Sequence, residues 1–123
     1  MSRASANSSR KKLPSKCCKT PCSIEKGMSL LNGKWKGSIL WHLGKGSMRF
    51  NDLVRLFAGA SKKMIDLRLK QMEKHGLVKR DVLSTKPLAV LYSITDFGRS
   101  ALEVLRTLKI WVENEENYNL NPN

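Results

Sequence analysis

Three cysteines near the N-terminus are the residues of this sequence best suited to chemistry. They are Cys17, Cys18 and Cys22. An odd, clustered set of cysteines in a chain that shows no apolar secretory signal indicates free thiols rather than a disulfide framework. A zinc site would need a fourth ligand, which the sequence does not offer, and adjacent ligands are awkward geometrically. We therefore predict no metal ion and no cofactor.

Cys22 is the candidate redox sensor among the three. It precedes a predicted helix and lies among Lys16, Lys19 and Lys26, whose positive charges favour the nucleophilic thiolate. Oxidation or alkylation at this position would add bulk or a cross-link. In the alternative interpretation, Cys22 is a small, half-buried packing residue without a chemical role.

No pattern in the sequence predicts an enzyme. The two histidines, His42 and His75, have no serine or cysteine partner at a spacing typical of nucleophilic catalysis. Neither a glycine-rich phosphate loop nor a paired carboxylate motif is recognisable. Trp35 could stack on a ligand, but it lies on the apolar stripe of a predicted helix, which favours packing. We therefore predict no catalytic residues.

The charge balance predicts a polyanionic partner. The 123 residues include 23 lysines and arginines against 10 acidic residues, a formal net charge of +13. Residues 1–20 are basic and are expected to form a flexible arm, but residues 21–112 also carry an excess of positive charge. DNA, RNA or an acidic membrane surface would suit such a chain. No apolar run approaches the roughly 20 residues of a membrane span, so we expect a cytoplasmic protein with no membrane partner.

The first part of the expected domain has the hydrophobic spacing of helices. Apolar residues recur at intervals of three and four residues along four segments. These segments are 24–31, 34–43, 52–57 and 62–75. Asn51 and Ser61 directly precede the last two and are typical N-cap residues. Residues 48–50 are expected to form a short extended link.

The hydrophobic period changes after Gly76. Alternating apolar and polar residues predict two strands, over 77–83 and 88–94, and residues 84–87 have the composition of a turn. Thr95 is expected to cap one long final helix over 96–114. A helix-turn-helix followed by a hairpin is the order of a winged helix-turn-helix domain. We therefore predict a mainly α (α+β) fold with a two-stranded antiparallel wing and extra terminal helices.

Several short motifs follow one another in the order and spacing of one regulator family. They are Cys22-x-Ile24-Glu25, Leu31-Asn32-Gly33-Lys34-Trp35-Lys36, Arg49-Phe50-Asn51-Asp52-Leu53 and Thr95-x-x-Gly98-Arg99. In these residues the chain resembles the HxlR family of bacterial winged helix-turn-helix transcriptional regulators. The resemblance covers most of the expected domain at 21–116, which lies between the arm 1–20 and a C-terminal tail, 117–123. It implies a homodimer with its recognition helix and wing on DNA. Some members sense oxidants or electrophiles, and Cys22 matches the position of the family's cysteine.

Within that fold, the expected DNA contacts come from the helix-turn-helix and the wing. They are Arg49, Asn51, Ser61, Lys62, Lys63, Asp66, Leu67, Lys70 and Lys86. Lysines reach phosphates or guanine edges, and Asp66 can accept a hydrogen bond from cytosine. The alternatives are an ordinary solvated basic helix face, a turn lysine at the hairpin tip, and a purely capping role for Asn51.

The final helix carries more apolar side chains than a single packed face requires, which predicts a second partner surface. A two-fold dimer is the simplest partner, and helix 24–31 is the nearest element able to contribute to it. The expected interface residues are Ile24, Met28, Leu31, Leu105, Leu108, Trp111 and Val112.

The sequence thus predicts a sequence-specific transcriptional regulator that binds an inverted-repeat operator in double-stranded DNA as a homodimer. The recognition helix, 61–75, would enter the major groove, and the wing, 83–89, would contact the backbone or minor groove. One alternative is a sensor regulator that responds to thiol oxidation or to a small-molecule effector. The other is a basic protein that binds nucleic acid without sequence preference.

Overall fold

A computed structural model describes residues 22–115, and these divide into two units at the boundary between Leu31 and Asn32. The first unit contains the single described helix α2, Ser23–Leu31. This confirms the helix predicted over 24–31. It ends two residues before Gly33, which has a φ of 128°. The predicted arm, 1–20, and tail, 117–123, lie outside the described residues.

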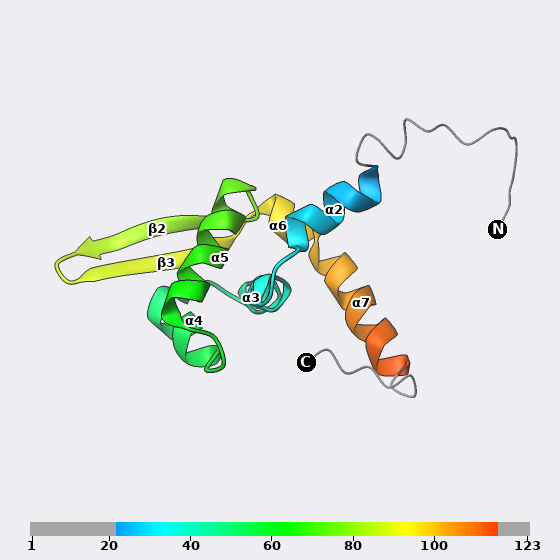
Figure 1. The fold of residues 1–123 in the computed structure, drawn as a ribbon. Coiled ribbons are helices and arrows are strands. Elements are labelled where there is room, and N and C mark those ends of the chain that lie inside the picture. The colour runs from blue at the N-terminus through cyan, green and yellow to red at the C-terminus, as the bar shows by residue number, and fades with distance from the viewer. Residues whose placement is uncertain (1–21, 116–123) are drawn as a thin grey trace, which may run out of the picture. The chain divides into compact units, whose positions relative to one another are not determined.

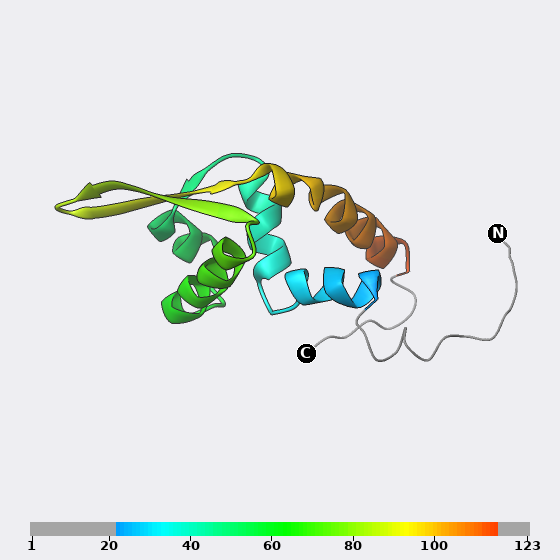
Figure 2. The same cartoon turned by 90° about the horizontal axis from the view of Figure 1, so that it is seen from above.

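The second unit has the order of elements of a winged helix-turn-helix domain, as predicted (Figure 1). Its helices and strands are α3 (Lys36–Leu43), β1 (Met48–Arg49), α4 (Phe50–Leu56), α5 (Lys62–Lys74), β2 (Val78–Thr85), β3 (Leu88–Ile94), α6 (Asp96–Ser100) and α7 (Leu102–Asn114). Within this unit the hairpin of β2 and β3 extends well beyond the helices, as Figure 2 also shows.

The sheet has three antiparallel strands in the order β1-β3-β2, so β3 is central. Residues 48–50 were expected to form a short extended link. Met48 and Arg49 are extended, but as a strand of the sheet, and Phe50 already belongs to α4. Met48 pairs with Tyr92 of β3, and Arg49 pairs with Leu91. A strand of two residues is too short to show alternation, which is why the pattern did not reveal it.

The hairpin turn is shorter than predicted, because β2 continues to Thr85 and β3 begins at Leu88. Only Lys86 and Pro87 lie between the strands. The pairing register shifts between Val82 and Ser84, which leaves Leu83 as an extra residue in β2.

The buried stripe of α5 is the one the sequence predicted. Ile65, Leu69 and Met72 are inaccessible to solvent and lie at the i, i+4 and i+7 positions of one helix face. The Ser61 side chain caps this helix, since its Oγ accepts a hydrogen bond from the Met64 N–H at 3.0 Å. Gly76, at a φ of 77°, turns the chain from the end of α5 toward β2.

The predicted cap of α4 is wrong. This helix begins at Phe50, so Asn51 lies in its first turn, and Arg49 occupies the cap position without a side-chain cap bond. The cause is the ladder between β1 and β3, which holds the chain extended through Arg49 and sends it directly into the helix. Asp52 instead forms an ion pair with Arg55 one turn later.

The predicted start of α3 is also wrong, and Trp35 does not lie on its core stripe. Trp35 precedes the helix at a φ of 80°, a left-handed conformation that is unusual for a residue with a side chain. Its half-buried ring meets the Phe57 ring edge-on at a centroid distance of 5.7 Å. The interpretation of Trp35 as a packing residue is therefore confirmed. Its predicted position within the helix is not, because Trp35 precedes α3.

The predicted final helix is divided at Ala101 into α6 and α7. Thr95 caps α6 as expected, because its Oγ1 accepts a hydrogen bond from the Gly98 N–H at 2.9 Å. Gly98 is buried against the backbone of Leu77. A β-carbon at position 98 would come within 2.1 Å of the Leu77 carbonyl oxygen. This close approach brings the start of α6 directly against the root of the hairpin.

Candidate nucleic-acid interface

The face of α5 opposite the buried stripe is basic and open to solvent. Lys62, Lys63 and Lys70 are exposed, and Leu67 is an exposed leucine among them. The helical repeat brings Lys63, Leu67 and Lys70 to one side, since they are four and three residues apart. This arrangement offers two ammonium groups and one apolar group to a partner without disturbing the core.

Asp66 lies beside this basic face and forms an ion pair with Lys70. The Asp66 Oδ2 and Lys70 Nζ atoms are 3.1 Å apart, and both side chains are substantially exposed. An exposed pair of this kind contributes little to stability, so either partner can exchange it for another contact at small cost.

The start of α5 is tied to α4 through Lys62. The Lys62 ammonium lies 5.9 Å from the centre of the Phe50 ring, within the range of a cation–π contact. Arg49 and Asn51 are both exposed at the beginning of α4, next to Phe50. Phe50 lies between Arg49 and Asn51 in the sequence and contacts Lys62. The predicted DNA contacts at the start of α4 and at the start of α5 therefore lie close together.

The hairpin tip is exposed and carries Lys86, as predicted. Sequence reasoning missed the apolar residues that flank it: Val82, Leu83 and Leu88 are all exposed near the end of the hairpin. The extra residue Leu83 interrupts the alternation that would otherwise place apolar side chains on one face.

Tyr92 connects the root of the wing to α5, a role that the sequence did not reveal. It is buried and lies opposite Arg80 in the hairpin register. Burial raises the pKa of the Tyr92 hydroxyl above its ordinary value, a hydrogen bond from Arg80 opposes the rise, and the carboxylates of Asp66 and Glu73 add to it. Asp66 and Glu73 belong to α5, which packs against β2. The alternation of Val90, Tyr92 and Ile94 was the signal for the inward position of Tyr92.

Arg68 belongs to α5 but points away from the basic face. Its Nε donates a hydrogen bond to the Lys34 carbonyl oxygen at 2.9 Å, and its Nη1 donates to Gln71 Oε1 at 3.1 Å. The neighbouring Lys36 is buried, and its pKa is lowered first by burial and then by the charge of Arg68. Charge counting along the helix therefore overestimates the number of cations available to a partner.

The sequence comparison decides the family. The model of the HxlR-like helix-turn-helix family matches residues 30–119, which is most of the chain and all of the second unit's described elements. The chain belongs to the HxlR-like family. Together with the winged-helix geometry, this membership shows that the protein is a DNA-binding transcriptional regulator.

Its relatives include regulators from bacteria. The chain is 37% identical over 92 residues to the HTH-type transcriptional regulator YdeP of Bacillus subtilis (strain 168), a match that covers 75% of this chain and 72% of YdeP. Among solved structures, the redox regulator HypR in its reduced form matches with a TM-score of 0.73 and 33% identity, over 77% of this chain and 94% of HypR. The reduced form of YodB from B. subtilis matches with a TM-score of 0.66 and 30% identity, over 76% and 93% of the two chains.

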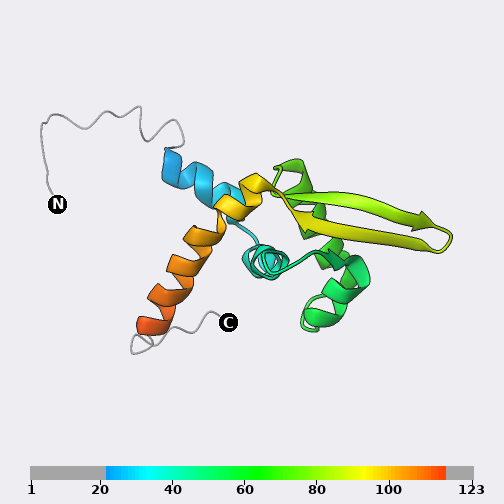
Figure 3. The same ribbon diagram turned by 180° about the vertical axis from the view of Figure 1, so that it is seen from behind.

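The helix α7 of this HxlR-like regulator extends away from the hairpin (Figure 3). It leaves most of its apolar side chains in solvent. The exposed apolar residues are Val104, Leu108, Ile110, Trp111 and Val112. Leu105 is the buried residue of this helix, and its Cδ2 atom lies 3.4 Å from the position that a β-carbon on Gly37 would occupy. Leu105 is therefore part of the chain's own core, whereas the sequence analysis placed it in the dimer interface.

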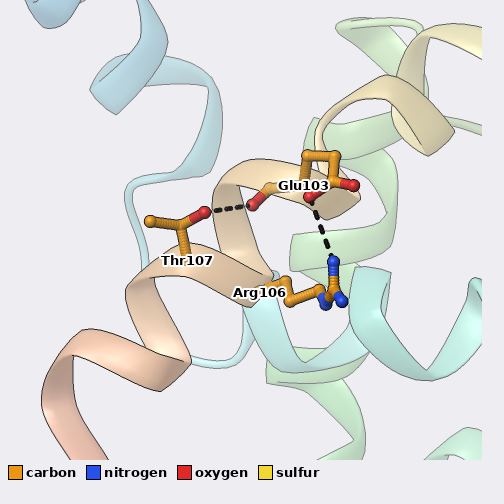
Figure 4. Close-up of polar contacts among 3 residues, drawn as sticks. All are labelled: Glu103, Arg106 and Thr107. Carbon is orange, nitrogen blue, oxygen red and sulfur yellow. Dashed lines mark hydrogen bonds and ion pairs between the residues drawn. The ribbon is translucent and has the colours of Figure 1, made fainter. Parts of the chain in front are cut away.

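Val104, Leu108 and Trp111 line a shallow groove of about 470 Å³ together with Glu103 and Thr107. The three apolar residues are spaced by four and three positions, so they form one stripe along α7. The Thr107 hydroxyl donates a hydrogen bond to the Glu103 carbonyl oxygen at 2.9 Å, which directs it to the helix's own backbone (Figure 4). The groove is thus predominantly apolar.

The helix α2 has no buried residue in the structure. Ile24 is 70% exposed and Met28 is 62% exposed, while Leu31 is half-buried. A nine-residue helix with an uncovered apolar side is marginal by itself in water, so a partner surface would stabilise it.

Cys22 directly precedes α2 and is a half-buried free thiol. Its carbonyl oxygen accepts the Lys26 N–H at 2.9 Å, which begins the hydrogen-bond pattern of the helix. The other two predicted thiols, Cys17 and Cys18, lie outside the described residues. Among residues 22–115, no three histidine, cysteine or acidic side chains come together as metal ligands would. No helix in the same range has the length and apolar character that crossing a membrane requires.

Proposed function

We propose that this HxlR-like regulator reads its operator with α5 in the major groove. The observation that carries the proposal is the two-sidedness of α5: its buried stripe fixes the helix in the domain while Lys63, Leu67 and Lys70 face solvent. The capped N-terminus at Ser61 leaves the first turn rigid, and N-terminal residues of a recognition helix are those that contact bases.

Each exposed group on this face has a chemical role available on DNA. Lys63 and Lys70 can donate to phosphates or to guanine edges, and Leu67 can contact a thymine methyl group. Asp66, once Lys70 turns to a phosphate, can accept from the amino group of cytosine. Arg49 and Asn51 would bind the backbone at the start of α4, and Lys86 would reach a phosphate or the minor groove from the wing.

We propose a homodimer as the functional unit. The apolar stripe of Val104, Leu108 and Trp111 on α7 supports it, as does the uncovered apolar side of α2. A two-fold dimer presents two recognition helices, which would suit two half-sites separated by about 34 Å, one helical turn of DNA. The operator would then be an inverted repeat. Because chromosomal DNA is the target, the site of action would be the cytoplasm.

The decisive experiment measures DNA affinity of Lys63→Ala and Lys70→Ala as a function of salt, on DNA selected from a random pool. If a lysine binds only phosphate, its loss should lower the affinity for every DNA sequence and reduce the salt slope by about one unit. If a lysine contacts a base, its loss should weaken binding by about 1–3 kcal/mol, and only on the selected site.

Lys109→Ala, on α7, is the matched control, since it removes the same charge from an exposed helix face. If both α5 variants bind like this control, the assignment of α5 is wrong. Competition with random DNA separates specific from non-specific binding, because a specific complex should survive an excess of about 10³-fold.

A second candidate function is thiol sensing, which is favoured by the similarity to the redox regulator HypR and by the position of Cys22 at the start of α2. In this scheme diamide would take two electrons and two protons from two thiols and leave a disulfide. The link would displace α2 and, through the dimer, change the spacing of the recognition helices. DNA binding before and after diamide should differ for the wild type and stay constant for Cys22→Ser. Equal responses of the two proteins would exclude this role for Cys22.

A further inference from the structure

A second cavity of the domain lies between α3 and the pair α6 and α7, away from the residues proposed to contact DNA. Its volume is about 270 Å³. It is lined by Trp41, Gly44, Lys45, Arg99, Leu102, Glu103 and Arg106. Arg99 belongs to the Thr95-x-x-Gly98-Arg99 motif, and the DNA interface gives that arginine no role.

The cavity's inner wall depends on a glycine. A β-carbon at Gly44 would lie 2.7 Å from Leu102 Cδ1 and 3.2 Å from the Trp41 carbonyl oxygen. The absence of a side chain at this position therefore lets Leu102 approach the end of α3 and provide an apolar surface between the two helices.

The rim of the cavity is cationic. Lys45, Arg99 and Arg106 contribute three positive charges, and Glu103 is the single carboxylate among the lining residues. Within residues 22–115, no acidic side chain forms an ion pair with Lys45 or Arg99. Cations gathered around a concave apolar surface lower the energy of an anion placed between them.

Arg106 has a partner, but a weak one. Its Nη1 is 3.5 Å from Glu103 Oε1, at the long end of hydrogen-bonding distance, and both side chains are largely exposed (Figure 4). Such a pair is readily exchanged, because exposed ion pairs contribute about 1 kcal/mol or less. A stronger or better-placed carboxylate could therefore replace that of Glu103.

We propose that this cavity binds a small organic anion with a flat apolar body, of the class of aromatic carboxylates. The carboxylate is held by Arg99 and Arg106, with Lys45 adding charge, and the ring lies against Leu102 and Trp41. The cavity volume of about 270 Å³ lies just below the usual range for ligand sites, about 300–1,000 Å³, so the cavity suits a single ring rather than a larger cofactor. The Glu103 carboxylate competes with the ligand carboxylate for Arg106 and therefore lowers the affinity of the cavity for the ligand.

Calorimetry on the full chain with benzoate and salicylate tests the proposal, with inorganic phosphate and benzyl alcohol as probes for charge alone and ring alone. We expect measurable binding of the aromatic carboxylates and at least about tenfold weaker binding of phosphate and benzyl alcohol, since each lacks one of the two interactions. Arg99→Gln should weaken benzoate binding about tenfold. Glu103→Gln should strengthen it, whereas Lys109→Gln, a matched loss of charge elsewhere on α7, should leave it unchanged.

Several results would overturn the proposal. Undetectable benzoate binding at millimolar concentration would do so, as would benzyl alcohol binding as tightly as benzoate. Phosphate binding as tightly as benzoate would show a general anion site, one suited to a nucleic-acid backbone. Thermal melting of Arg99→Gln verifies its fold; if that variant is unfolded, Lys45→Gln and Glu103→Gln still test the idea, because they must change affinity in opposite directions.

Discussion

The side chain of Arg68 holds the backbone of Lys34, with 2.9 Å between the Arg68 Nε and the Lys34 carbonyl oxygen. The arginine belongs to α5, and the carbonyl belongs to the turn that precedes α3. The guanidinium also lies 3.0 Å from the position that a β-carbon on Gly33 would occupy. The recognition helix is thus fixed to the start of the domain by a side chain, in addition to its apolar stripe.

Removing this contact should destabilise the domain without affecting DNA contacts directly. We expect Arg68→Ala to lower the free energy of unfolding by about 1–2 kcal/mol, because a charged donor and its bond to a backbone carbonyl are lost. Urea denaturation measures the change. Lys70→Ala, an exposed residue of the same helix, should stay within about 0.5 kcal/mol of the wild type. An Arg68→Ala protein as stable as Lys70→Ala would contradict the assignment.

Gly98 should tolerate no larger residue. In Gly98→Ala the new β-carbon would overlap the Leu77 carbonyl oxygen, which is backbone and cannot rotate away. We expect a loss of about 3 kcal/mol or failure to fold. Gly46→Ala is the matched control, since no atom lies within 4 Å of its β-carbon position and its φ is not positive. Similar melting temperatures for the two variants would show that the α6 contact relaxes easily.

Two exposed leucines should separate dimerisation from DNA binding. Leu108 on α7 is 49% exposed and Leu67 on α5 is 45% exposed, so the two positions are matched in residue type and exposure. Leu108→Asp should dissociate the dimer, because a charge in an apolar interface is costly, and Leu67→Asp should leave it intact. Leu67→Asp should instead weaken DNA binding by repelling phosphates.

Sedimentation velocity measures the oligomeric state of each variant, and a titration with operator DNA measures its affinity. The proposal requires Leu67→Asp to remain dimeric while it loses DNA affinity. It requires Leu108→Asp to become monomeric, with weaker operator binding as a consequence of losing the second half-site contact. A wild type that is monomeric at micromolar concentration, or a Leu108→Asp protein that remains dimeric, would rule out the α7 interface.

The domain should lose stability in mild acid through His42. Burial lowers the pKa of His42 below its ordinary value, and the charge of Lys45 lowers it further. The unfolded chain then binds a proton at His42 more readily than the folded chain. Stability is therefore fully present above the unfolded pKa and is lost as the pH falls toward the folded value.

Thermal melting between about pH 7.5 and about pH 5.5 measures this effect. The fall in melting temperature should be smaller in His42→Gln than in the wild type, whereas His75→Gln, at the exposed end of α5, should keep the full decrease. Equal pH dependence in all three proteins would show that His42 does not control it.

Much of this fold was accessible from local patterns. The spacing of Ile65, Leu69 and Met72 predicted the buried face of α5, and Ser61 and Thr95 marked helix starts that the structure retains. These features depend on neighbours within a few residues, so the sequence reports them directly. The exposure of Lys63 and Lys70 follows from the same spacing, because α5 residues that do not lie on the buried stripe face solvent.

The features that were missed depend on contacts between distant residues. The left-handed conformation of Trp35 is compatible with the packing of its ring on Phe57, which is more than twenty residues away. The start of α4 depends on pairing between Arg49 and Leu91. Arg68 counts as one more exposed cation until Lys34 is known to lie beside it. No period or cap motif contains that information.

The central position of β3 has a consequence for synthesis of the protein. Among the strands of residues 22–115, β1 and β2 both pair with β3, which is the last of the three to leave the ribosome. A nascent chain that ends before Leu88 carries the complete recognition helix but leaves β2 without its ladder partner. Unpaired strands promote association between chains. Premature termination in the hairpin should therefore produce a fragment prone to aggregation and proteolysis, rather than a small DNA-binding domain that competes with the intact regulator.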